Sequence, residues 1–173
     1  MHKIKKLDSS SIDLVMECIE DARLLLRNSG SLQWNTPDGY PTKDDMLKDI
    51  LKGNLYGYVD QTGIRGICAI VIGEDENYKT IDGAWTDLSN TYVAIHRIAV
   101  RKDSYGSGVS ISLVEQAKEI MRSNNLKSIK GDTHKINIPM QKLLLKCGFK
   151  RTGVITLLRT KIDNLREAFE YNE

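Results

Sequence analysis

The sequence predicts an α/β domain of the α+β kind, with helices packed on a sheet that holds both parallel and antiparallel strand pairs. Residues 92–132 read as an apolar strand, a polar turn with two glycines, an amphipathic helix and a second strand, which is a parallel crossover. Residues 55–59 and 64–72 are apolar runs separated by a tight polar turn, the pattern of an antiparallel hairpin.

A short strand at residues 4–7 is predicted to open the chain, and the first helix follows it. The polar run at 8–11 supplies N-capping side chains for this helix. Apolar residues then recur at helical spacing from residue 12 to residue 26, and Gly30 ends the pattern.

A loop at residues 31–41, punctuated by prolines and a glycine, separates this helix from the next. The loop carries Trp34 and Tyr40, two large rings that in a purely structural interpretation fill the gap between the helices. The second helix is predicted over residues 43–51, because a Thr and an Asp stand at its start in capping-box spacing.

The later segments complete the sheet. Residues 73–90 are polar and irregular, and they are predicted as a surface loop anchored by Ile81 and Trp85. A helix is predicted at 138–147 with a proline tolerated in its first turn, and two closing strands are predicted at 151–158 and 165–171.

The turn at residues 101–110 is the part of the sequence that points to a ligand. Gly106 and Gly108 stand just before the crossover helix, where glycine permits positive φ and close approach of the main chain. Unpaired N–H groups of the first helical turn, with the helix dipole behind them, favour an anion such as a phosphate. An ordinary strand-to-helix connection can carry the same glycines, so the turn alone does not name the ligand.

Taken with its flanks, the stretch at residues 98–113 resembles the acyl-CoA-binding motif of the GNAT acetyltransferases, Gln/Arg-x-x-Gly-x-Gly/Ala at the start of a helix. Tyr105 stands where the family usually has Gln or Arg, Gly108 matches the central glycine, and Ser110 replaces the last small residue. A second block, residues 137–149, resembles the family's Asn-led helix that ends in Gly-Phe. The two blocks follow the family's order and spacing.

The resemblance implies one acetyltransferase domain over residues 1–173, with a mixed, mostly antiparallel central sheet that is splayed at its parallel pair and flanked by helices. It also implies an acyl-CoA-dependent N-acetyltransferase that moves an acetyl group from acetyl-CoA directly to a primary amine of a small molecule or peptide. A homodimer is left open as the assembly state.

The resemblance further implies where each substrate binds. Main-chain N–H groups of the turn would hold the pyrophosphate, the crossover strand would pair with the pantetheine arm, and an N–H near Ile98 or Val100 would face the developing oxyanion. The residues so assigned to acetyl-CoA are Ile98, Ala99, Val100, Tyr105, Gly106, Ser107, Gly108, Val109, Ser110 and Asn137. Trp34 and Tyr40 are assigned to the acceptor pocket, which this loop borders in the family.

Two histidines are candidates for acid–base catalysis. Strand alternation predicts that one face carries Ala94, His96, Ile98 and Val100. His96 is the candidate general base, acting through water, because imidazole titrates near neutral pH and some GNAT enzymes carry a His there; a satisfied core histidine is the structural alternative. Arg97 is expected on the opposite face, paired with a carboxylate. His134, just past the next strand, is the candidate acid or substrate contact.

One departure from the family concerns the acid for the leaving thiolate. The family often has a Tyr four residues before the Gly of Gly-Phe, and Leu144 occupies this position. A non-catalytic acyl-CoA-binding sensor or interaction module is therefore the second functional hypothesis. A dinucleotide-binding domain, suggested by Gly106 and Gly108 with Asp132, is disfavoured because five polar residues precede the glycines and too few residues remain for a doubly wound sheet.

The composition limits the partners. Charged residues make up 28% and hydrophobic residues 40% of the 173 residues, and the formal net charge is +2. No run of Lys and Arg is long enough for a nucleic-acid-binding stripe, and no apolar run reaches membrane length. We therefore expect neither nucleic acid nor a membrane as a partner.

The three cysteines indicate the compartment. Cys18, Cys68 and Cys147 lie far apart in apolar surroundings, without the Cys/His spacing of a zinc site, so no metal is expected. They are predicted to be buried thiols in a reducing compartment. Because no signal-peptide pattern is present either, the protein is predicted to be cytoplasmic.

Overall fold

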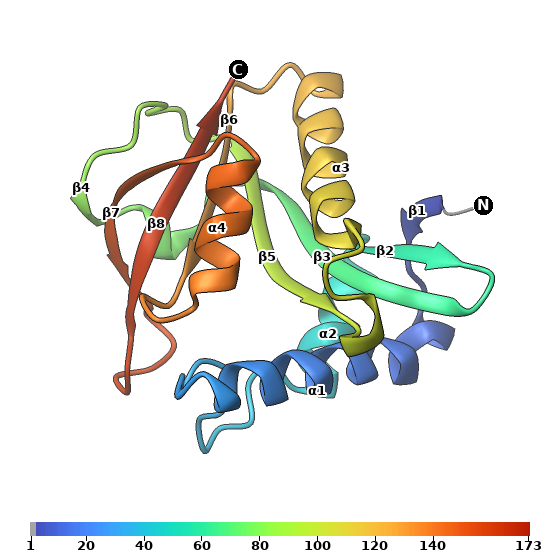
Figure 1. The fold of residues 1–173 in the computed structure, drawn as a ribbon. Coiled ribbons are helices and arrows are strands. Elements are labelled where there is room, and N and C mark those ends of the chain that lie inside the picture. The colour runs from blue at the N-terminus through green and yellow to red at the C-terminus, as the bar shows by residue number, and fades with distance from the viewer. Residues whose placement is uncertain (1–2) are drawn as a thin grey trace.

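A computed structural model describes residues 3–173 of the protein (Figure 1). Helices and strands follow one another largely in the predicted order. Their bounds are β1 (Lys3–Lys6), α1 (Ile12–Asn28), α2 (Lys43–Leu51), β2 (Leu55–Asp60), β3 (Gly63–Gly73), β4 (Ile81–Gly83), β5 (Tyr92–Val100), α3 (Val109–Ser123), β6 (Ser128–Thr133), α4 (Ile138–Lys146), β7 (Lys150–Thr156) and β8 (Leu165–Asn172).

Capping side chains lie before the first two helices, but only α2 is capped directly. Asp8 accepts a hydrogen bond from the Ser10 N–H and caps a short 3-10 turn that leads into α1. Thr42 and Asp45 form the predicted capping box at the start of α2, because each side chain accepts from the main-chain N–H of the other residue. The predicted capping is therefore direct at α2, whereas at α1 the N-cap Ser11 makes no side-chain hydrogen bond and Asp8 caps the preceding turn.

The strands of the described chain form one eight-stranded sheet in the order β1-β2-β3-β5-β6-β8-β7-β4. Neighbouring strands are antiparallel except β5 and β6, which confirms the predicted mixed, mostly antiparallel fold. The parallel pairing joins only residues 93–95 to residues 129–131, although β5 continues to Val100. Along its second half, β5 therefore has no strand neighbour within the described chain on the side that faces β6, and the sheet is open there.

The sequence analysis missed β4. This strand lies in the 73–90 segment, which was predicted to be irregular, and it pairs antiparallel with β7 at the edge of the sheet, with Ile81 opposite Ile155. Three residues are too few to show an alternating pattern, so a short edge strand leaves little trace in a sequence. The predicted anchor Trp85 is buried beside it and donates from Nε1 to the Tyr78 carbonyl (2.8 Å).

Helices cover both faces of the sheet. Alternate residues of β3 divide between two clusters: Cys68 and Ile70 pack with α3 and α4, whereas Ile67 and Ala69 pack with α1 and α2. Figure 1 shows α3 and α4 beside β5, with α1 crossing the end of that strand. No helix within residues 3–173 is long and apolar enough to cross a membrane.

A β-bulge in β5 overturns the predicted alternation. Ala69 of β3 is paired with His96 and Ile67 with Ala99, so two residues of β5, Arg97 and Ile98, stand against one of β3. Arg97 has a φ of 52°, which turns the strand at this point. The predicted common face is therefore wrong beyond His96, and Arg97 is not on the opposite face from it.

The core clusters confirm this change of face. Ala94 packs in the cluster that contains Tyr78, whose ring lies 5.9 Å from the ring of His96. Ile98 and Val100 pack instead against the cluster under α3 and α4. The bulge thus separates His96 from the two apolar residues that follow it.

Candidate active site

Two cavities lie where the sheet is open, and they meet each other. The first, here termed the splay cavity, has a volume of about 730 Å³ and is lined by residues 95–100 of β5, residues 104–111, the end of β6 and α4. The second, here termed the polar cavity, has a volume of about 430 Å³ and is lined by the loop before α2, the end of β3 and the β7–β8 connection. The residues that line both are Gln33, Trp34, His96, Arg97 and Asp132.

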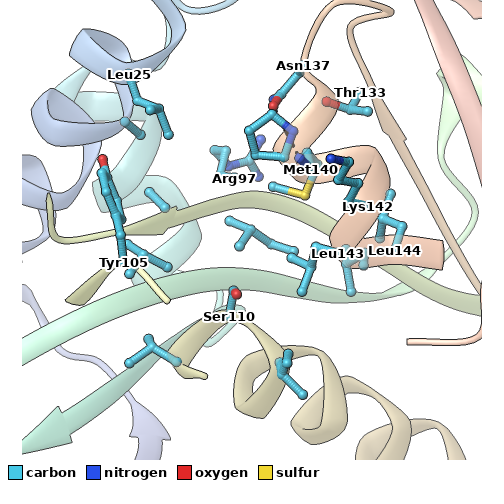
Figure 2. A pocket seen from close by; sticks show the side chains of 18 of the residues that line it. Leu25, Arg97, Tyr105, Ser110, Thr133, Asn137, Met140, Lys142, Leu143 and Leu144 are labelled. Atoms are coloured by element: carbon cyan, nitrogen blue, oxygen red, sulfur yellow. Dashed lines mark hydrogen bonds between the residues drawn. The ribbon is translucent and has the colours of Figure 1, made fainter. Parts of the chain in front are cut away.

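The residues predicted to bind acetyl-CoA come together around the splay cavity. Figure 2 shows Tyr105 and Ser110 on one side of it, and side chains of α4 across from them. The predicted residues that line it are Ile98, Ala99, Val100, Tyr105, Gly106, Ser107, Gly108, Val109, Ser110 and Asn137.

The glycine turn presents free N–H groups to this cavity. Gly106 and Gly108 have φ values of 76° and 88°, in the region that favours glycine. Gly108 is the N-cap of α3 and has no side chain to cap the helix. Within residues 3–173, the N–H groups of Val109, Ser110 and Ile111 have no acceptor. The start of α3 can therefore hold an anion.

Tyr105 connects the same turn to α1. Its hydroxyl donates to the main-chain carbonyl of Asp21 (3.2 Å), and the residue remains 44% exposed at the wall of the splay cavity. The residue that replaces the family's Gln or Arg therefore closes the side of the cavity where Leu25 also lies (Figure 2).

The wall formed by α4 combines apolar contact with positive charge. Lys142 and Lys146, one helical turn apart, line the splay cavity and have no carboxylate partner in the described chain. Leu144 also lines it and is 2% exposed, so the position where the family often has a Tyr faces the ligand space without a proton to give. Asn137 caps α4 through Oδ1, which accepts from the Met140 N–H (3.3 Å).

Thr133 brings an unsatisfied group to the same cavity. Its residue is fully buried, and Oγ1 is the one buried side-chain polar atom within residues 3–173 that lacks a hydrogen-bond partner. A buried hydroxyl without a partner costs about 1–3 kcal/mol. Because Thr133 lines the splay cavity, a bound ligand with a polar group can satisfy it (Figure 2).

His96 forms a pair with Asp75 at the junction of the cavities. Its Nε2 lies 2.9 Å from Asp75 Oδ2, and both side chains are 18% exposed. Burial by itself would raise the pKa of the Asp75 carboxyl, but the hydrogen bond and charge of His96, with two Asn77 donors, outweigh it and lower the pKa to about 2. A proton on Nε2 leaves the Nδ1 lone pair of His96 available as a base.

Arg97 is fixed on the polar-cavity side by a carboxylate, as expected. Its Nε and Nη2 donate to the two oxygens of Asp49 (2.6 and 2.9 Å), and its Nη1 donates to the Tyr40 hydroxyl (2.7 Å). The guanidinium of Arg159 also lies over the Tyr40 ring, with Cζ 3.6 Å from the ring centroid. Tyr40 therefore lies in the wall of the polar cavity, and Trp34 lies where the two cavities meet.

His134 lies in the wall of neither cavity. It is 5% exposed, its Nδ1 accepts from the Ile136 N–H (3.2 Å), and its Nε2 lies 2.8 Å from Asp163 Oδ1. Both ring nitrogens are thus occupied, Nδ1 by the turn that leads into α4 and Nε2 by Asp163 of the β7–β8 connection. We therefore do not include His134 in the proposed reaction.

Several residues of the site were not found from the sequence. Asp75 and Arg166 come from segments without a motif, so nothing in their neighbourhoods marked them. Thr133 could have been found, because it ends a strand of the predicted parallel pair, where the sheet was expected to be splayed. Asp132 was considered only for a dinucleotide, and it lines both cavities. Lys142 and Lys146 could also have been found, since their spacing places both on one side of α4.

Solved structures with a similar fold include acetyltransferases. A GNAT-family acetyltransferase structure from Streptococcus agalactiae is 28% identical, has a TM-score of 0.89, and is matched over 99% of this chain and 95% of that one. The fold is also shared with the PaiA N-acetyltransferase of Thermoplasma acidophilum, solved in complex with coenzyme A (14% identity, TM-score 0.70, 100% and 99% of the two chains).

A curated relative matches part of the chain. Streptothricin acetyltransferase of Escherichia coli is 35% identical over 74 residues, which are 43% of this chain and 40% of that protein. The match thus covers less than half of the relative. The profile of the Acetyltransferase (GNAT) family matches residues 20–149, a span that includes the glycine turn, β5, β6 and α4. The chain therefore belongs to the GNAT acetyltransferase family.

Proposed function

We propose that the protein is an N-acetyltransferase that moves an acetyl group from acetyl-CoA directly to a primary amine. The observation that carries this proposal is the meeting of the two cavities at the His96–Asp75 pair. A thioester in the splay cavity and an amine in the polar cavity would face each other at a titratable side chain, without a covalent intermediate on the protein.

The lining of the splay cavity fits acetyl-CoA. Free N–H groups at the start of α3 suit the pyrophosphate, and Lys142 and Lys146 offer positive charge for phosphates. The buried Thr133 hydroxyl would find a partner on the polar pantetheine arm. Beyond Ile95, main-chain groups of β5 that face β6 have no strand partner and are free to bond this arm.

The reaction needs a base for the amine and donors for the oxyanion. We assign the base to His96 Nδ1, acting directly or through water, with Asp75 holding the ring and stabilising its protonated form. The amine nitrogen bonds to the thioester carbon, a main-chain N–H near Ile98 or Val100 stabilises the charge on oxygen, and the carbon–sulfur bond then breaks.

The leaving thiolate does not need an acid at Leu144. An ordinary thiol has a pKa of about 8.5, so a CoA thiolate is a stable leaving group near neutral pH. This chemistry is compatible with an enzyme that lacks the tyrosine at this position. A cytoplasmic location, where acetyl-CoA is available, and a small-molecule or peptide acceptor remain part of the proposal.

Amine-dependent release of CoA tests the proposal against the sensor hypothesis. Purified protein is given acetyl-CoA and a panel of primary amines, and free thiol is followed with a chromogenic reagent. We expect release that depends on both the amine and the protein. Binding of acetyl-CoA without release from any amine in the panel would favour the acyl-CoA-binding sensor instead.

A further inference from the structure

Most charges in the polar cavity are neutralised by other side chains. Asp49 is paired with Arg97, and Asp75 with His96. Arg159 is paired with Asp38 at 2.9 Å. These groups are already committed within the protein and leave little net charge for a ligand.

Two cations that line the cavity have no ion pair within residues 3–173: Lys52, which is exposed, and Arg166, which is buried. Arg166 is only 5% exposed, and its Nη1 donates to the main-chain carbonyls of Asp163 (2.6 Å) and Leu165 (2.8 Å). Within residues 3–173 its Nε and Nη2 have no acceptor, and no carboxylate lies within ion-pair distance of it. Since Arg166 lines the polar cavity, these remaining donors are the ones that a ligand can reach.

The surroundings of Arg166 favour binding of an anion at its guanidinium. Burial lowers the pKa of its guanidinium, the charges of Asp132 and Asp163 oppose this, and the like charge of Arg159 adds to the lowering. A buried cation without a counter-ion is costly, and a ligand anion removes this cost. Two guanidiniums therefore stand near each other beside Tyr40, and one of them lacks a carboxylate partner.

Asp132 provides the opposite charge at the other end of the cavity. Its Oδ1 accepts from the Tyr78 hydroxyl (2.6 Å), and it lines both cavities, next to His96. Asp132 is paired with Ala168 across β6 and β8, and Arg166 lies two residues before Ala168 on the same face. Diagonal neighbours of this kind are about 7–8 Å apart, a span that a small zwitterion can bridge.

We infer that the acceptor is a primary amine that also carries a carboxylate, in other words an amino acid or a related molecule, with the carboxylate on Arg166 and the amine beside Asp132 and His96. This inference rests on the proposed acetyl transfer and narrows its acceptor. A planar guanidinium with free donors binds a carboxylate in a bidentate manner, which an amide or an alcohol cannot reproduce.

Matched pairs of acceptors test the inference on the wild-type protein. Each of several α- and ω-amino acids is compared with its own carboxamide, which keeps the amine and the length but removes the negative charge. We expect kcat/KM for the acid to exceed that for the amide by about tenfold or more, the size of a charged hydrogen-bonded pair. Equal values for acid and amide would overturn the inference.

Two variants assign the preference to Arg166. In Arg166→Met, the ratio of kcat/KM for the acid to kcat/KM for the amide should fall to about one. Arg166→Lys keeps the positive charge in case the first variant folds poorly, and it should lower this ratio less. Arg151→Met is the matched control, because Arg151 pairs with Glu167 on the same sheet but lines neither cavity. A ratio that stays at the wild-type value in Arg166→Met would contradict the assignment.

Two further arms separate the remaining outcomes. If an aminophosphonate analogue competed better for the site than the amino acid, the inferred carboxylate would be wrong and the acceptor would carry a phosphate group instead. Binding of amino acids and amides to the CoA complex, followed by thermal shift, gives a readout that does not need turnover. Arg166-dependent binding of the acids would support the inference even if no amine released CoA, a result that would contradict only the proposed catalysis.

Discussion

At the scale of single residues, the proposed acid–base chemistry rests on the pair of His96 and Asp75. The Asp75 carboxylate lies 2.9 Å from His96 Nε2. His96 lines both cavities, whereas Asp75 lines the polar cavity alone. The pair resembles the base and its orienting carboxylate in hydrolases, in which the carboxylate fixes the tautomer and stabilises the imidazolium. Removing either group should therefore affect turnover more than substrate binding.

We predict that His96→Ala lowers kcat by about 10²-fold or more, the effect of losing a general base, with little change in acetyl-CoA affinity. His134→Ala is the matched control, since this histidine lies in neither cavity. Steady-state rates and acetyl-CoA titrations measure the two effects. If the two variants lost turnover equally, or if His96→Ala retained it, His96 would be a core residue and not the base.

Asp75 gives a prediction about stability and pH. Its pKa is lowered from 3.8 to about 2 in the folded protein, so its carboxylate stabilises the fold above about pH 4, and this contribution is lost as the pH falls toward 2. At about 1.4 kcal/mol per pKa unit, the contribution is on the order of 2 kcal/mol. We expect Asp75→Asn to lower the free energy of unfolding by roughly this amount at pH 7.

Urea unfolding as a function of pH checks this prediction. The difference between wild type and Asp75→Asn should shrink as the pH is lowered from 5 toward 2, because the wild-type carboxylate is then protonated as well. A difference that stayed constant over this range would mean that the amide disturbs packing and that the ionised carboxylate does not stabilise the fold.

Sequence reasoning reached some of these residues and not others. His96 could be found because it stands at a strand position with a known pattern. Asp75 could not, because it follows β3 in a segment without periodicity and meets His96 only after the chain has folded. The sequence could not show where the His134 ring points, and in the structure the residue lines neither cavity.

At the scale of elements, the proposed binding of acetyl-CoA rests on the glycine turn and the start of α3. Gly108→Val should remove CoA binding, because a β-branched side chain at φ 88° distorts the turn and stands where the ligand approaches. Gly30→Val is the matched control: Gly30 has a φ of 76° and open space around it, but lies outside both cavities.

Both variants should lose about 1–2 kcal/mol of stability from the left-handed conformation alone. CoA at about 100 times its dissociation constant should stabilise the wild type and Gly30→Val by roughly 2.7 kcal/mol, and should leave Gly108→Val unchanged. Thermal shift measures this. A shift of equal size in both variants, or a shift with NAD and none with CoA, would contradict the assignment of the turn.

Element prediction succeeded where periodicity and capping were strong. The capping box at Thr42 set α2, and the helical spacing after residue 12 set α1. It failed at β4, which is three residues long, and at the β5 bulge. A bulge inserts one residue into a strand without any change in composition. If strict alternation is assumed, every residue after the bulge is therefore predicted on the wrong face.

At the scale of the whole molecule, the active site depends on where distant segments meet. The splay cavity could be anticipated because it lies at one parallel crossover with recognisable motifs. The polar cavity could not, because residues from the 33–40 loop, α2, the end of β3 and the β7–β8 connection line it. Its lining is set by the closure of the sheet, which no single stretch of sequence encodes.

The positions of the three cysteines bear on whether the protein could carry the acetyl group covalently. Burial raises the pKa of Cys18 and of Cys68 to about 12, and it also raises the pKa of Cys147. None of the three lines either cavity. The two cavities of the described chain therefore present no cysteine thiolate that could accept the acetyl group, which supports the proposed transfer with both substrates bound.

Initial-velocity kinetics with both substrates varied tests this central claim most directly, once an acceptor is in hand. Direct transfer in a ternary complex predicts double-reciprocal lines that intersect, together with an unchanged protein mass after incubation with acetyl-CoA alone. Parallel lines, with a gain of one acetyl group in the protein mass, would contradict it, because they would show an acetylated enzyme that the two meeting cavities do not require.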